Sequence, residues 1–274
     1  MDNREMIVLV TGASSGIGNA CATHLAKRGF RVYGTSRNPS NYSKKADEFF
    51  DLVQMNATDD QSVAKAVASV IAKEGRIDAV VCNAGMGISG SVEDSSLDEI
   101  KLQMDTNFMG AVRVVKAVLP SFRAVGKGRI IVLSSIAGVM GMPFQAFYSS
   151  SKFALEGFIE SLRYEMRPFG VEACLIEPGD FRTGFTAARR PAQTSSEGAY
   201  AKYYDAAMGI QVRDETAGHD PIEAAKLVQS LLEKRHLNVR YTVGPFIERL
   251  SVMVKRLVPA RLFEVVYRKY YKLP

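Results

Sequence analysis

Tyr148 and Lys152 have the spacing expected of a proton-transfer pair. They lie four positions apart near the start of an expected helix, Phe147–Arg167. Side chains four residues apart share one face of a helix, so the phenol and the ammonium group would be neighbours. A free tyrosine has a pKa of about 10, which is too high for efficient proton exchange near neutrality, and a nearby ammonium group lowers it. The pair therefore predicts a general acid and base built on Tyr148.

Ser135 is the third candidate catalytic residue. It lies thirteen residues before Tyr148, at the end of an expected strand, and its hydroxyl would hold a substrate carbonyl. The stretch Ser149–Lys152 also fits SxxK, the nucleophile motif of penicillin-binding proteins and some β-lactamases. No SDN or KTG motif follows it, and an isolated motif needs its structural context. Proton transfer is therefore favoured over acyl transfer.

A glycine-rich segment with the sequence TGASSGIG, residues 11–18, joins the first expected strand to the first expected helix. Glycine allows a tight turn and lets a pyrophosphate approach the amides at a helix N-terminus. The spacing is GxxxGxG rather than GxGxxG, so a tight turn alone is the alternative. In this position the segment predicts a dinucleotide site, with contacts from Gly12, Ser14, Ser15, Gly16, Ile17 and Gly18.

The end of the second expected strand bears on the choice of cofactor. An NAD-specific site needs an acidic residue near this point to accept hydrogen bonds from the ribose hydroxyls. Ser36 stands there instead, and the guanidinium of Arg37 could pair with a 2′-phosphate. A solvated loop position is the alternative for Arg37. The missing acid favours NADP(H) over NAD(H).

The elements that must position these residues alternate along the first part of the chain. Runs rich in Val and Ile with little polar alternation predict strands that are buried on both faces of a parallel sheet. Regular strand–helix alternation predicts an α/β fold with a doubly wound, Rossmann-like parallel sheet in a single domain. The expected strands are Met6–Thr11, Arg31–Ser36, Asp51–Met55, Asp78–Cys82, Arg129–Ser134, Val171–Glu177 and Val239–Val243. The expected helices are Gly16–Arg28, Asp60–Glu74, Leu97–Arg123, Phe147–Arg167 and Pro221–Lys234.

The pattern is irregular between residues 182 and 220, with one short helix expected at Ala199–Met208. A long irregular stretch in a compact domain is typical of a lid or binding loop, so we expect a substrate lid here. The dinucleotide-binding and catalytic domain is then residues 1–245. Residues 246–274 form a C-terminal helical extension.

This extension is basic and amphipathic. The chain has a net charge of +6, and its positive charge is concentrated after residue 233. Apolar residues at 246, 250, 253, 254 and 257 fall on one helical face, and Phe263, Val266, Tyr267 and Tyr270 are spaced similarly. Such a segment could rest on an anionic membrane or dock an acidic carrier. Packing over its own core or a partner subunit is the interpretation we favour, because amphipathic helices are ordinary in globular proteins.

Composition excludes several other classes. With 47% hydrophobic and 23% charged residues the chain is ordinary for a soluble globular protein. It contains no apolar run long enough for a transmembrane helix and no signal peptide, so we expect a cytoplasmic protein. The three cysteines lie far apart and predict buried, reduced thiols, and we expect no metal site. The basic residues do not spread over one binding face, so nucleic acid is not an expected partner.

Taken together, these motifs resemble those of the classical short-chain dehydrogenase/reductase family over roughly residues 5–245. The resemblance is closest to its 17β-hydroxysteroid and retinol dehydrogenase-like branch. It rests on TGASSGIG at 11–18, Asn83-Ala84-Gly85 after the fourth strand, Asn107, Ser135, and Tyr148 with Lys152. Pro178-Gly179 and Thr183 fit the family's PGxxxT segment.

The resemblance implies catalytic roles. Tyr148 would be the acid in ketone reduction and the base in alcohol oxidation. Lys152 would bind the nicotinamide ribose and lower the pKa of Tyr148. Ser135 would orient the carbonyl, and Asn107 would hold a water molecule that links Lys152 to solvent.

It also implies cofactor contacts. Asn83, Ala84 and Gly85 would line the adenosine side, and Pro178 and Gly179 would flank the nicotinamide. Thr183 would hydrogen-bond the carboxamide. The family often has an acidic residue after the third strand, where this chain has Asn56. An amide can still donate or accept there, so we expect adenine binding of altered strength.

The substrate is predicted less directly. Met142, Phe144 and Phe185 would lie near the active site and indicate an apolar pocket for a steroid, retinoid or long-chain carbonyl, although core packing also recruits such residues. The predicted activity is hydride transfer between NADP(H) and a ketone, aldehyde or secondary alcohol. A 3-oxoacyl-carrier-protein reductase and a catalytically silent cofactor-binding sensor are the alternatives. In the family, helices such as 97–123 and 147–167 usually form an interface, so a homodimer or homotetramer is expected.

Overall fold

Seven parallel strands form the centre of the structure, a computed structural model that describes residues 6–43, 49–193 and 198–274. Their order across the sheet is β3-β2-β1-β4-β6-β7-β9. The strands are β1 Ile7–Val10, β2 Arg31–Ser36, β3 Asp51–Gln54, β4 Ala79–Cys82, β6 Gly128–Leu133, β7 Val171–Pro178 and β9 Arg240–Val243. The predicted parallel sheet is confirmed, with strand ends that differ by at most one residue.

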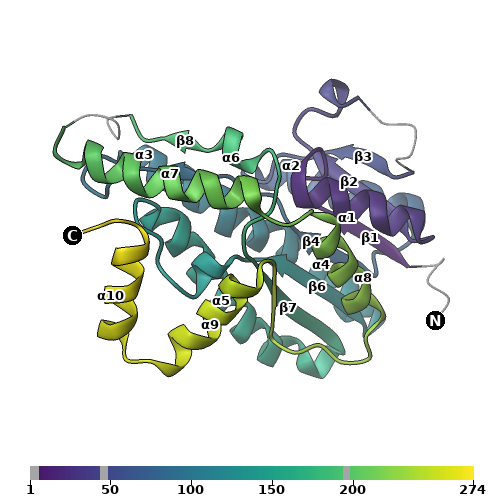
Figure 1. Cartoon of the computed structure of the whole chain (residues 1–274). Coiled ribbons are helices and arrows are strands. Elements are labelled where there is room, and N and C mark those ends of the chain that lie inside the picture. The colour runs from purple at the N-terminus through teal and green to yellow at the C-terminus, as the bar shows by residue number, and fades with distance from the viewer. Residues whose placement is uncertain (1–5, 44–48, 194–197) are drawn as a thin grey trace.

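Helices cover both faces of this sheet (Figure 1). Alternate residues of a strand point to opposite faces, so Ile7 and Leu9 of β1 pack in one apolar cluster and Val8 and Val10 in another. Both clusters are buried, which explains the unbroken Val and Ile runs of the sequence. One face carries α2 Asp60–Glu74, α4 Gly110–Val125 and α5 Ala146–Met166, and the other carries α1 Gly16–Lys27 and α8 Ile222–Glu233. The doubly wound Rossmann-like fold is therefore confirmed.

The strand order reverses beside β1. The chain runs outward from β1 through β2 to β3, and then returns to place β4 on the other side of β1. Connections that diverge in this way leave a crevice at the carboxyl ends of the two central strands. The glycine-rich segment follows β1 and Asn83-Ala84-Gly85 follows β4, so both motifs lie at this crevice.

Hydrogen bonds join these two strand ends. The backbone amides of Asn83 and Ala84 donate to Thr11 Oγ1 over 2.9 and 3.0 Å. The side-chain amide of Asn83 donates to the carbonyl oxygens of Thr11 and Gly12 over 3.0 and 3.2 Å. Gly18 presses against the same amide, because a Cβ at this position would lie 2.3 Å from Asn83 Nδ2. The glycine-rich turn is therefore held by the strand next to it.

The single helix expected at Leu97–Arg123 is divided into three segments. An α-helix, α3 Leu97–Met104, passes into a π-helical segment, Asp105–Met109, and then into α4. One wider turn leaves the hydrophobic periodicity nearly unchanged, so the π-helical segment could not be recognised from the apolar pattern. Such π-helical turns occur frequently at functional sites.

The segment expected to be irregular, residues 182–220, is more ordered than predicted. It contains the short helix α6 Phe185–Ala188 and the 17-residue helix α7 Ala201–Ala217, which extends nine residues beyond the end of the one expected. Two short strands, β5 Ile88–Ser89 and β8 Arg190–Pro191, pair and tie this segment to the body. The prediction failed because α7 has a weak apolar pattern. Residues 194–197 lie outside the described part.

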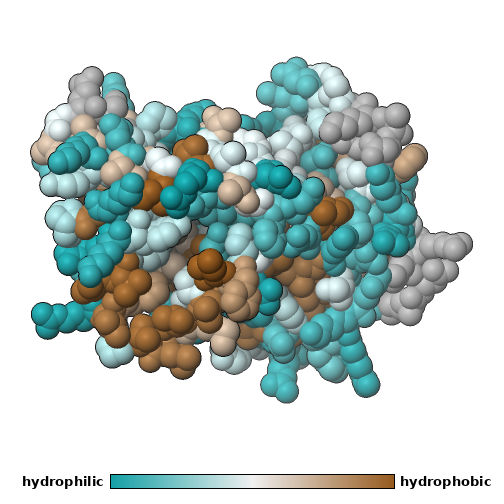
Figure 2. Space-filling model, in the orientation of Figure 1, coloured by the Kyte–Doolittle hydropathy of each residue, from teal (hydrophilic) through white to brown (hydrophobic). Residues whose placement is uncertain are grey.

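The C-terminal extension forms two helices, α9 Phe246–Leu257 and α10 Ala260–Tyr270 (Figure 1). The apolar face predicted to cover the core of the chain faces solvent instead. Phe246 is 73% exposed and Leu257 is 80% exposed. Figure 2 shows apolar surface gathered over these two helices. Packing onto its own core is therefore wrong for the predicted apolar residues of α9, where Val252 makes the buried contact instead, whereas Phe263 and Tyr267 of α10 do pack on the protein.

The remaining predictions about the chain as a whole concern thiols and membranes. Cys21, Cys82 and Cys174 are all free and buried, as predicted, and burial raises the pKa of each thiol to about 12. Within the described ranges no helix has both the length and the apolar character needed to cross a bilayer.

The contact between Gly18 and Asn83 gives a first prediction. Gly18→Ala would place its Cβ 2.3 Å from Asn83 Nδ2 and 2.3 Å from the Gly12 carbonyl oxygen. We expect the free energy of unfolding to fall by about 1–3 kcal/mol, as for other overpacked sites, measured by urea denaturation. Gly209→Ala in α7 is the control, because its Cβ would meet nothing within 4 Å, and it should raise stability by about 1 kcal/mol. An unchanged Gly18→Ala protein would contradict the packing argument.

Candidate active site

A cavity of about 790 Å³ opens at the carboxyl ends of the central strands. It receives most of the site residues predicted from the sequence. The exceptions are Gly18 and Asn107, which lie directly behind the wall, and Phe144. The predicted residues that line it are Gly12, Ser14, Ser15, Gly16, Ile17, Ser36, Arg37, Asn56, Asn83, Ala84, Gly85, Ser135, Met142, Tyr148, Lys152, Pro178, Gly179, Thr183 and Phe185.

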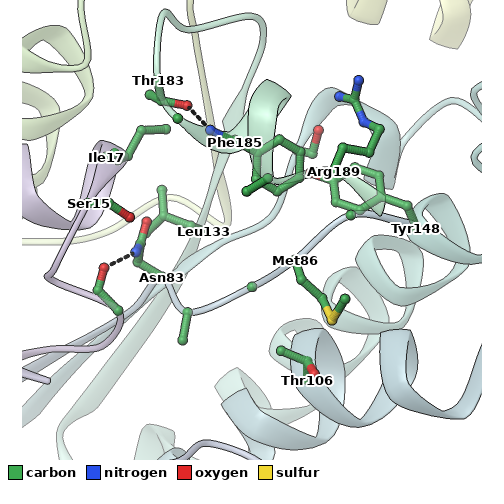
Figure 3. A pocket seen from close by; sticks show the side chains of 18 of the residues that line it. Ser15, Ile17, Asn83, Met86, Thr106, Leu133, Tyr148, Thr183, Phe185 and Arg189 are labelled. Atoms are coloured by element: carbon green, nitrogen blue, oxygen red, sulfur yellow. Dashed lines mark hydrogen bonds between the residues drawn. The ribbon is translucent and has the colours of Figure 1, made fainter. Parts of the chain in front are cut away.

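The N-terminus of α1 opens into this cavity. Ser15 occupies the N-cap position in an extended conformation, yet its side chain accepts no capping hydrogen bond, and the first turn contains no acidic residue. The first amides of the helix are therefore available to an anion. Gly16, at φ +57°, adopts the left-handed conformation at this turn and lies close to Thr183, because a Cβ there would be 3.6 Å from Thr183 Cβ. In Figure 3 Ser15, Ile17, Asn83 and Thr183 lie at one end of the cavity, and Tyr148 and Arg189 lie at the other.

Arg37 follows β2 at the far end of the cavity and is exposed. Its side chain forms no ion pair with any residue in the described ranges, so the guanidinium is available to a ligand. Ser36 lines the cavity beside it. Asn56 also lines this end, with its Oδ1 accepting hydrogen bonds from the amide and hydroxyl of Thr58. The end of β2 and the two positions after it are Ser36, Arg37 and Asn38, none of which is acidic.

Tyr148 and Ser135 meet in the middle of the cavity. Ser135 lies directly beyond β6 and Tyr148 lies in the first turn of α5, so two elements bring them together. Burial raises the pKa of Tyr148 to about 12, and a hydrogen bond with Ser135 partly offsets this rise. The phenol is therefore held in its protonated form near neutral pH.

Lys152 lies one turn further along α5 and is buried. Its Nζ lies 5.7 Å from the centre of the Tyr148 ring and donates a hydrogen bond to the Leu133 carbonyl oxygen over 2.8 Å. Burial lowers the pKa of Lys152 to about 8, an effect that the charge of Glu156 partly offsets. The pKa of Tyr148 is thus raised rather than lowered, because the loss of hydration outweighs the influence of this lysine.

Asn107 sits in the π-helical segment, behind the cavity wall. Its Oδ1 accepts from the Met86 amide over 2.8 Å, and its Nδ2 donates to the Met86 carbonyl oxygen and to Ser151 Oγ over 2.9 and 3.1 Å. The side chain therefore links the loop after β4 to α5. This places Asn107 beside the catalytic helix, and the water molecule expected from the family resemblance stays a prediction.

The three aromatic and methionine positions predicted to contact substrate separate into two groups. Phe185 stands 5.8 Å from the Tyr148 ring, centre to centre (Figure 3). Met142 also lines the cavity. Phe144 does not line the cavity; it packs edge to face on Tyr204 at 5.7 Å. Its backbone has φ 57°, which turns the chain away at this point.

The residues of the SxxK motif, Ser149–Lys152, lie in the first turns of α5. Ser149 is buried, and its Oγ accepts a hydrogen bond from the Met142 amide over 3.1 Å. Lys152 directs its Nζ to the Leu133 carbonyl oxygen. The serine is therefore occupied in holding the loop before α5, which disfavours a nucleophilic role.

Sequence reasoning missed a buried ion pair in the cavity wall. Arg189 pairs with Glu215 of α7, and their side chains are only 5% and 9% exposed. Thr186 and Gln211 also donate to this carboxylate. The Nε of Arg189 is buried and finds no partner within the described ranges. The two residues lie 26 positions apart in a stretch predicted to be irregular, so no short sequence pattern indicated the pair.

A second contact joins the C-terminal extension to the site. Glu248 of α9 accepts a hydrogen bond from the Asp180 amide over 2.7 Å. Gly179 leaves the space for this carboxylate, because a Cβ there would lie within 1.8 Å of it. Burial and the nearby Glu248 raise the pKa of Asp180 to about 8. The segment Pro178–Asp180 is thus shaped partly by the extension.

Comparisons with known proteins agree with this geometry. The family described as short chain dehydrogenase matches residues 6–194. The chain is 39% identical to the 3-ketodihydrosphingosine reductase of Bacteroides thetaiotaomicron, over 98% of this chain and 99% of that protein. It is 40% identical to human 17-beta-hydroxysteroid dehydrogenase type 1, over 65% of this chain and 58% of that protein. A crystal structure of a short-chain dehydrogenase from Streptomyces avermitilis shares 27% identity and superimposes with a TM-score of 0.79, covering 97% and 98% of the two chains.

The chain therefore belongs to the short-chain dehydrogenase family, whose members are oxidoreductases. The family resemblance read from the motifs is confirmed.

The buried lysine gives a second prediction. The pKa of Lys152 is lowered from 10.5 to about 8, so between these values the unfolded chain binds more protons than the folded one. Stability contributed by this site therefore rises with pH across that interval. Relative to Lys152→Met, the wild type should gain up to about 1 kcal/mol per pH unit between pH 8 and 10. Urea denaturation at a series of pH values measures it.

Lys65→Met removes an exposed lysine from α2 and is the matched control. Its stability difference from the wild type should stay constant over the same pH range. A constant difference for Lys152→Met as well would mean that the lysine is not held in a desolvated environment.

Proposed function

We propose that this protein is an NADP(H)-dependent reductase of a lipophilic ketone, with Tyr148 as the proton donor. The observation that carries the proposal is the meeting of Tyr148, Ser135 and Lys152 in one cavity with the uncapped N-terminus of α1. That arrangement puts a proton donor beside a place where a dinucleotide can bind. Either feature alone would fit many functions, whereas the two together fit carbonyl reduction.

The residues present fit a dinucleotide. The free amides at the start of α1 would receive the pyrophosphate, and Gly12 lets the backbone approach closely, since a Cβ there would lie 3.0 Å from Ala84 Cα. Asn83, Ala84, Gly85 and Asn56 would line the adenosine side. Pro178, Gly179 and Thr183 would flank the nicotinamide, whose hydride is the chemistry the cofactor supplies.

Arg37 and Ser36 favour NADP(H). An exposed guanidinium without an ion-pair partner in the described ranges suits a 2′-phosphate, and charge-assisted hydrogen bonds of this kind are strong. The lack of a carboxylate at the end of β2 removes the usual acceptor for the ribose hydroxyls of NAD.

The protein's part in the reaction is to place and protonate the carbonyl oxygen. Ser135 donates a hydrogen bond to this oxygen, and Tyr148 gives its phenolic proton to it as the carbonyl carbon is reduced. A pKa of about 12 keeps Tyr148 protonated until that moment. Lys152, when protonated, favours the phenolate that is left behind. Asn107 holds the loop after β4 against α5, so it positions the catalytic helix.

The cavity supports a substrate with an apolar body and a polar group near the ketone. Met142 and Phe185 offer apolar contact beside Tyr148. The buried Nε of Arg189 could donate to a second oxygen of the substrate, and the charges of Arg189 and Glu215 already influence Tyr148. A long-chain ketone with an amino alcohol head, as in 3-ketodihydrosphingosine, has this form. The full-length similarity to a reductase of that name favours it over a steroid or retinoid.

We further propose that the chain works in the cytoplasm as a homodimer or homotetramer. Three free, buried thiols suit a reducing compartment. α5 presents Phe153 and Tyr164 at 46% and 80% exposure, which suits a helix that contacts a second subunit. The ordered segment of α6 and α7 would act as the substrate lid, because Phe185, Arg189 and Glu215 close one side of the cavity.

The proposed reaction is tested by Tyr148→Phe. Loss of the phenolic proton should lower turnover of a long-chain 2-amino-3-ketone by at least about 100-fold while leaving NADPH affinity nearly unchanged. NADPH absorbance measures turnover, and titration calorimetry measures affinity. Tyr164→Phe is the control, since this exposed tyrosine lies on the same helix, and it should keep full activity.

The substrate panel should also contain the same ketone without its amino group, a steroid ketone, retinal and a 3-oxoacyl carrier protein. Preference for the carrier protein would move the assignment to the alternative reductase. Tight NADPH binding without turnover of any carbonyl would favour the silent sensor. Equal turnover by Tyr148→Phe would remove the proposed acid.

The cofactor assignment is tested by Arg37→Ala. Loss of the guanidinium should weaken NADPH binding by about 10- to 100-fold and leave NADH binding unchanged, because only NADPH carries the 2′-phosphate. Arg28→Ala, an exposed arginine at the other end of α1, is the control. Equal loss of both nucleotides would show that Arg37 acts through the fold of the loop rather than through the phosphate.

A further inference from the structure

The two C-terminal helices carry a continuous run of exposed apolar side chains, which we call the tail face. In α9 these residues recur at three- and four-residue intervals, so they share one side of the helix. The most exposed are Ile247 at 78% and Leu257 at 80%. The tail face consists of Phe246, Ile247, Leu250, Met253, Val254, Leu257, Leu262, Val265 and Val266.

The tail face is not the side by which these helices attach to the protein. Val252 of α9, Phe263 of α10 and Tyr271, the residue after α10, make the buried contacts, and they point away from the exposed residues. Figure 2 shows the apolar side chains gathered on α9 and α10, with mostly polar surface on the rest of this side. A contiguous group of exposed apolar side chains marks an interaction site in a stable protein.

Positive charge surrounds the tail face. Residues 246–274 contain seven Lys or Arg and two Glu, and Glu248 is turned inward to the Asp180 amide. Arg249 borders the apolar side chains of α9, and Lys269 stands among those of α10. Neither of them, nor Arg261 or Arg268, forms an ion pair with a residue of the described ranges. Their charges are therefore free to meet an anionic partner.

This combination favours a bilayer over a second copy of the chain. In a two-fold symmetric contact the same patch meets itself, so the unpaired basic residues of both copies would be brought together. An anionic lipid surface accepts apolar side chains in its acyl region and basic side chains at its phosphates. Lys269, placed within the apolar side, can extend its ammonium group to the headgroups along an apolar stem.

The inner side of α10 packs behind the wall of the cavity. Tyr267 of α10 directs its hydroxyl to Met142 Sδ at 3.2 Å, and the hydroxyl of Tyr271, the residue after α10, lies 3.2 Å from Gln211 Oε1. Met142 and Gln211 both line the cavity. The C-terminal extension therefore presents apolar surface outward and supports the wall of the cavity inward.

We propose that the tail face docks the protein on an anionic lipid bilayer, so that the cavity is held beside the membrane from which a lipophilic ketone can be taken. The docking stands on the tail face and its charges alone. Only the delivery of the ketone rests on the proposed function.

The experiment uses the full chain and vesicles of phosphatidylcholine with or without 30 to 40% phosphatidylglycerol, roughly the anionic content that draws polybasic segments to a surface. The chain contains no tryptophan, so Leu257→Trp gives a single reporter in the tail face. Its emission should shift to the blue on anionic vesicles, and the shift should weaken as salt is raised. Leu97→Trp, at a 72% exposed position on α3, should show no shift.

Paired substitutions measure the contribution of the face. Ile247→Ser with Leu257→Ser should weaken co-sedimentation with anionic vesicles by at least about tenfold, because two exposed apolar side chains no longer enter the acyl region. Val92→Ser with Leu97→Ser, at 63% and 72% exposed positions elsewhere, should bind like the wild type. Circular dichroism and turnover of a short, water-soluble ketone check that the variants fold.

The outcomes separate the two proposals. Vesicle binding that depends on the tail face, without reduction of any ketone, would support docking and refute the proposed function. Failure to bind anionic vesicles at low salt would overturn the docking proposal. So would vesicle binding that the tail-face substitutions leave intact. An oligomer that dissociates in Ile247→Ser/Leu257→Ser, with no vesicle binding, would assign the face to a second copy of the chain.

Discussion

The short hydrogen bonds between the ends of β1 and β4 are the constraint on which the site depends. The Thr11 hydroxyl oxygen accepts hydrogen bonds from the backbone amides of Asn83 and Ala84, and the side-chain amide of Asn83 donates to the Thr11 carbonyl oxygen in the turn after β1. Because these contacts fix where the chain leaves each strand, they set the position of the α1 N-terminus against the loop that carries Met86. Asn107 then ties that loop to α5, the helix of Tyr148 and Lys152. Two asparagines thus connect the dinucleotide side of the cavity to its catalytic side.

Desolvation explains the electrostatic character of the cavity better than pairwise charge does. Burial raises the pKa of Tyr148 and lowers that of Lys152, so it favours the neutral form of both groups. A spacing of four residues correctly places the two side chains on one face of a helix. It cannot reveal how much water they lose, since that depends on segments brought in from elsewhere, including Arg189 and Glu215.

The fold was predictable wherever one element could be recognised by its own pattern. β1 and β4 are continuous apolar runs, and Gly12 and Gly16 occupy left-handed conformations that a glycine-rich turn suggests. The π-helical turn at Asn107 was not predictable, because one widened turn hardly alters the apolar spacing. Only the first half of α7 was predicted, because its apolar pattern is weak. Phe144 was misplaced because its left-handed backbone directs it toward Tyr204. The tail face illustrates a further limit: periodicity identifies an apolar side of a helix but not what that side meets.

The hydrogen bond from the Asp180 amide to Glu248 couples the C-terminal extension to the wall of the cavity. Removing residues 246–274 would leave the half-buried Asp180 amide without its acceptor and leave empty the space beside Gly179 that Glu248 occupies. The extension is therefore not a detachable module. Any event that reorients α9 acts on the backbone of Gly179 and Asp180, and by thermodynamic reciprocity a ligand bound beside these residues acts on α9 with an equal coupling free energy. Ligand occupancy of the cavity and the orientation of α9 would then be linked through one equilibrium.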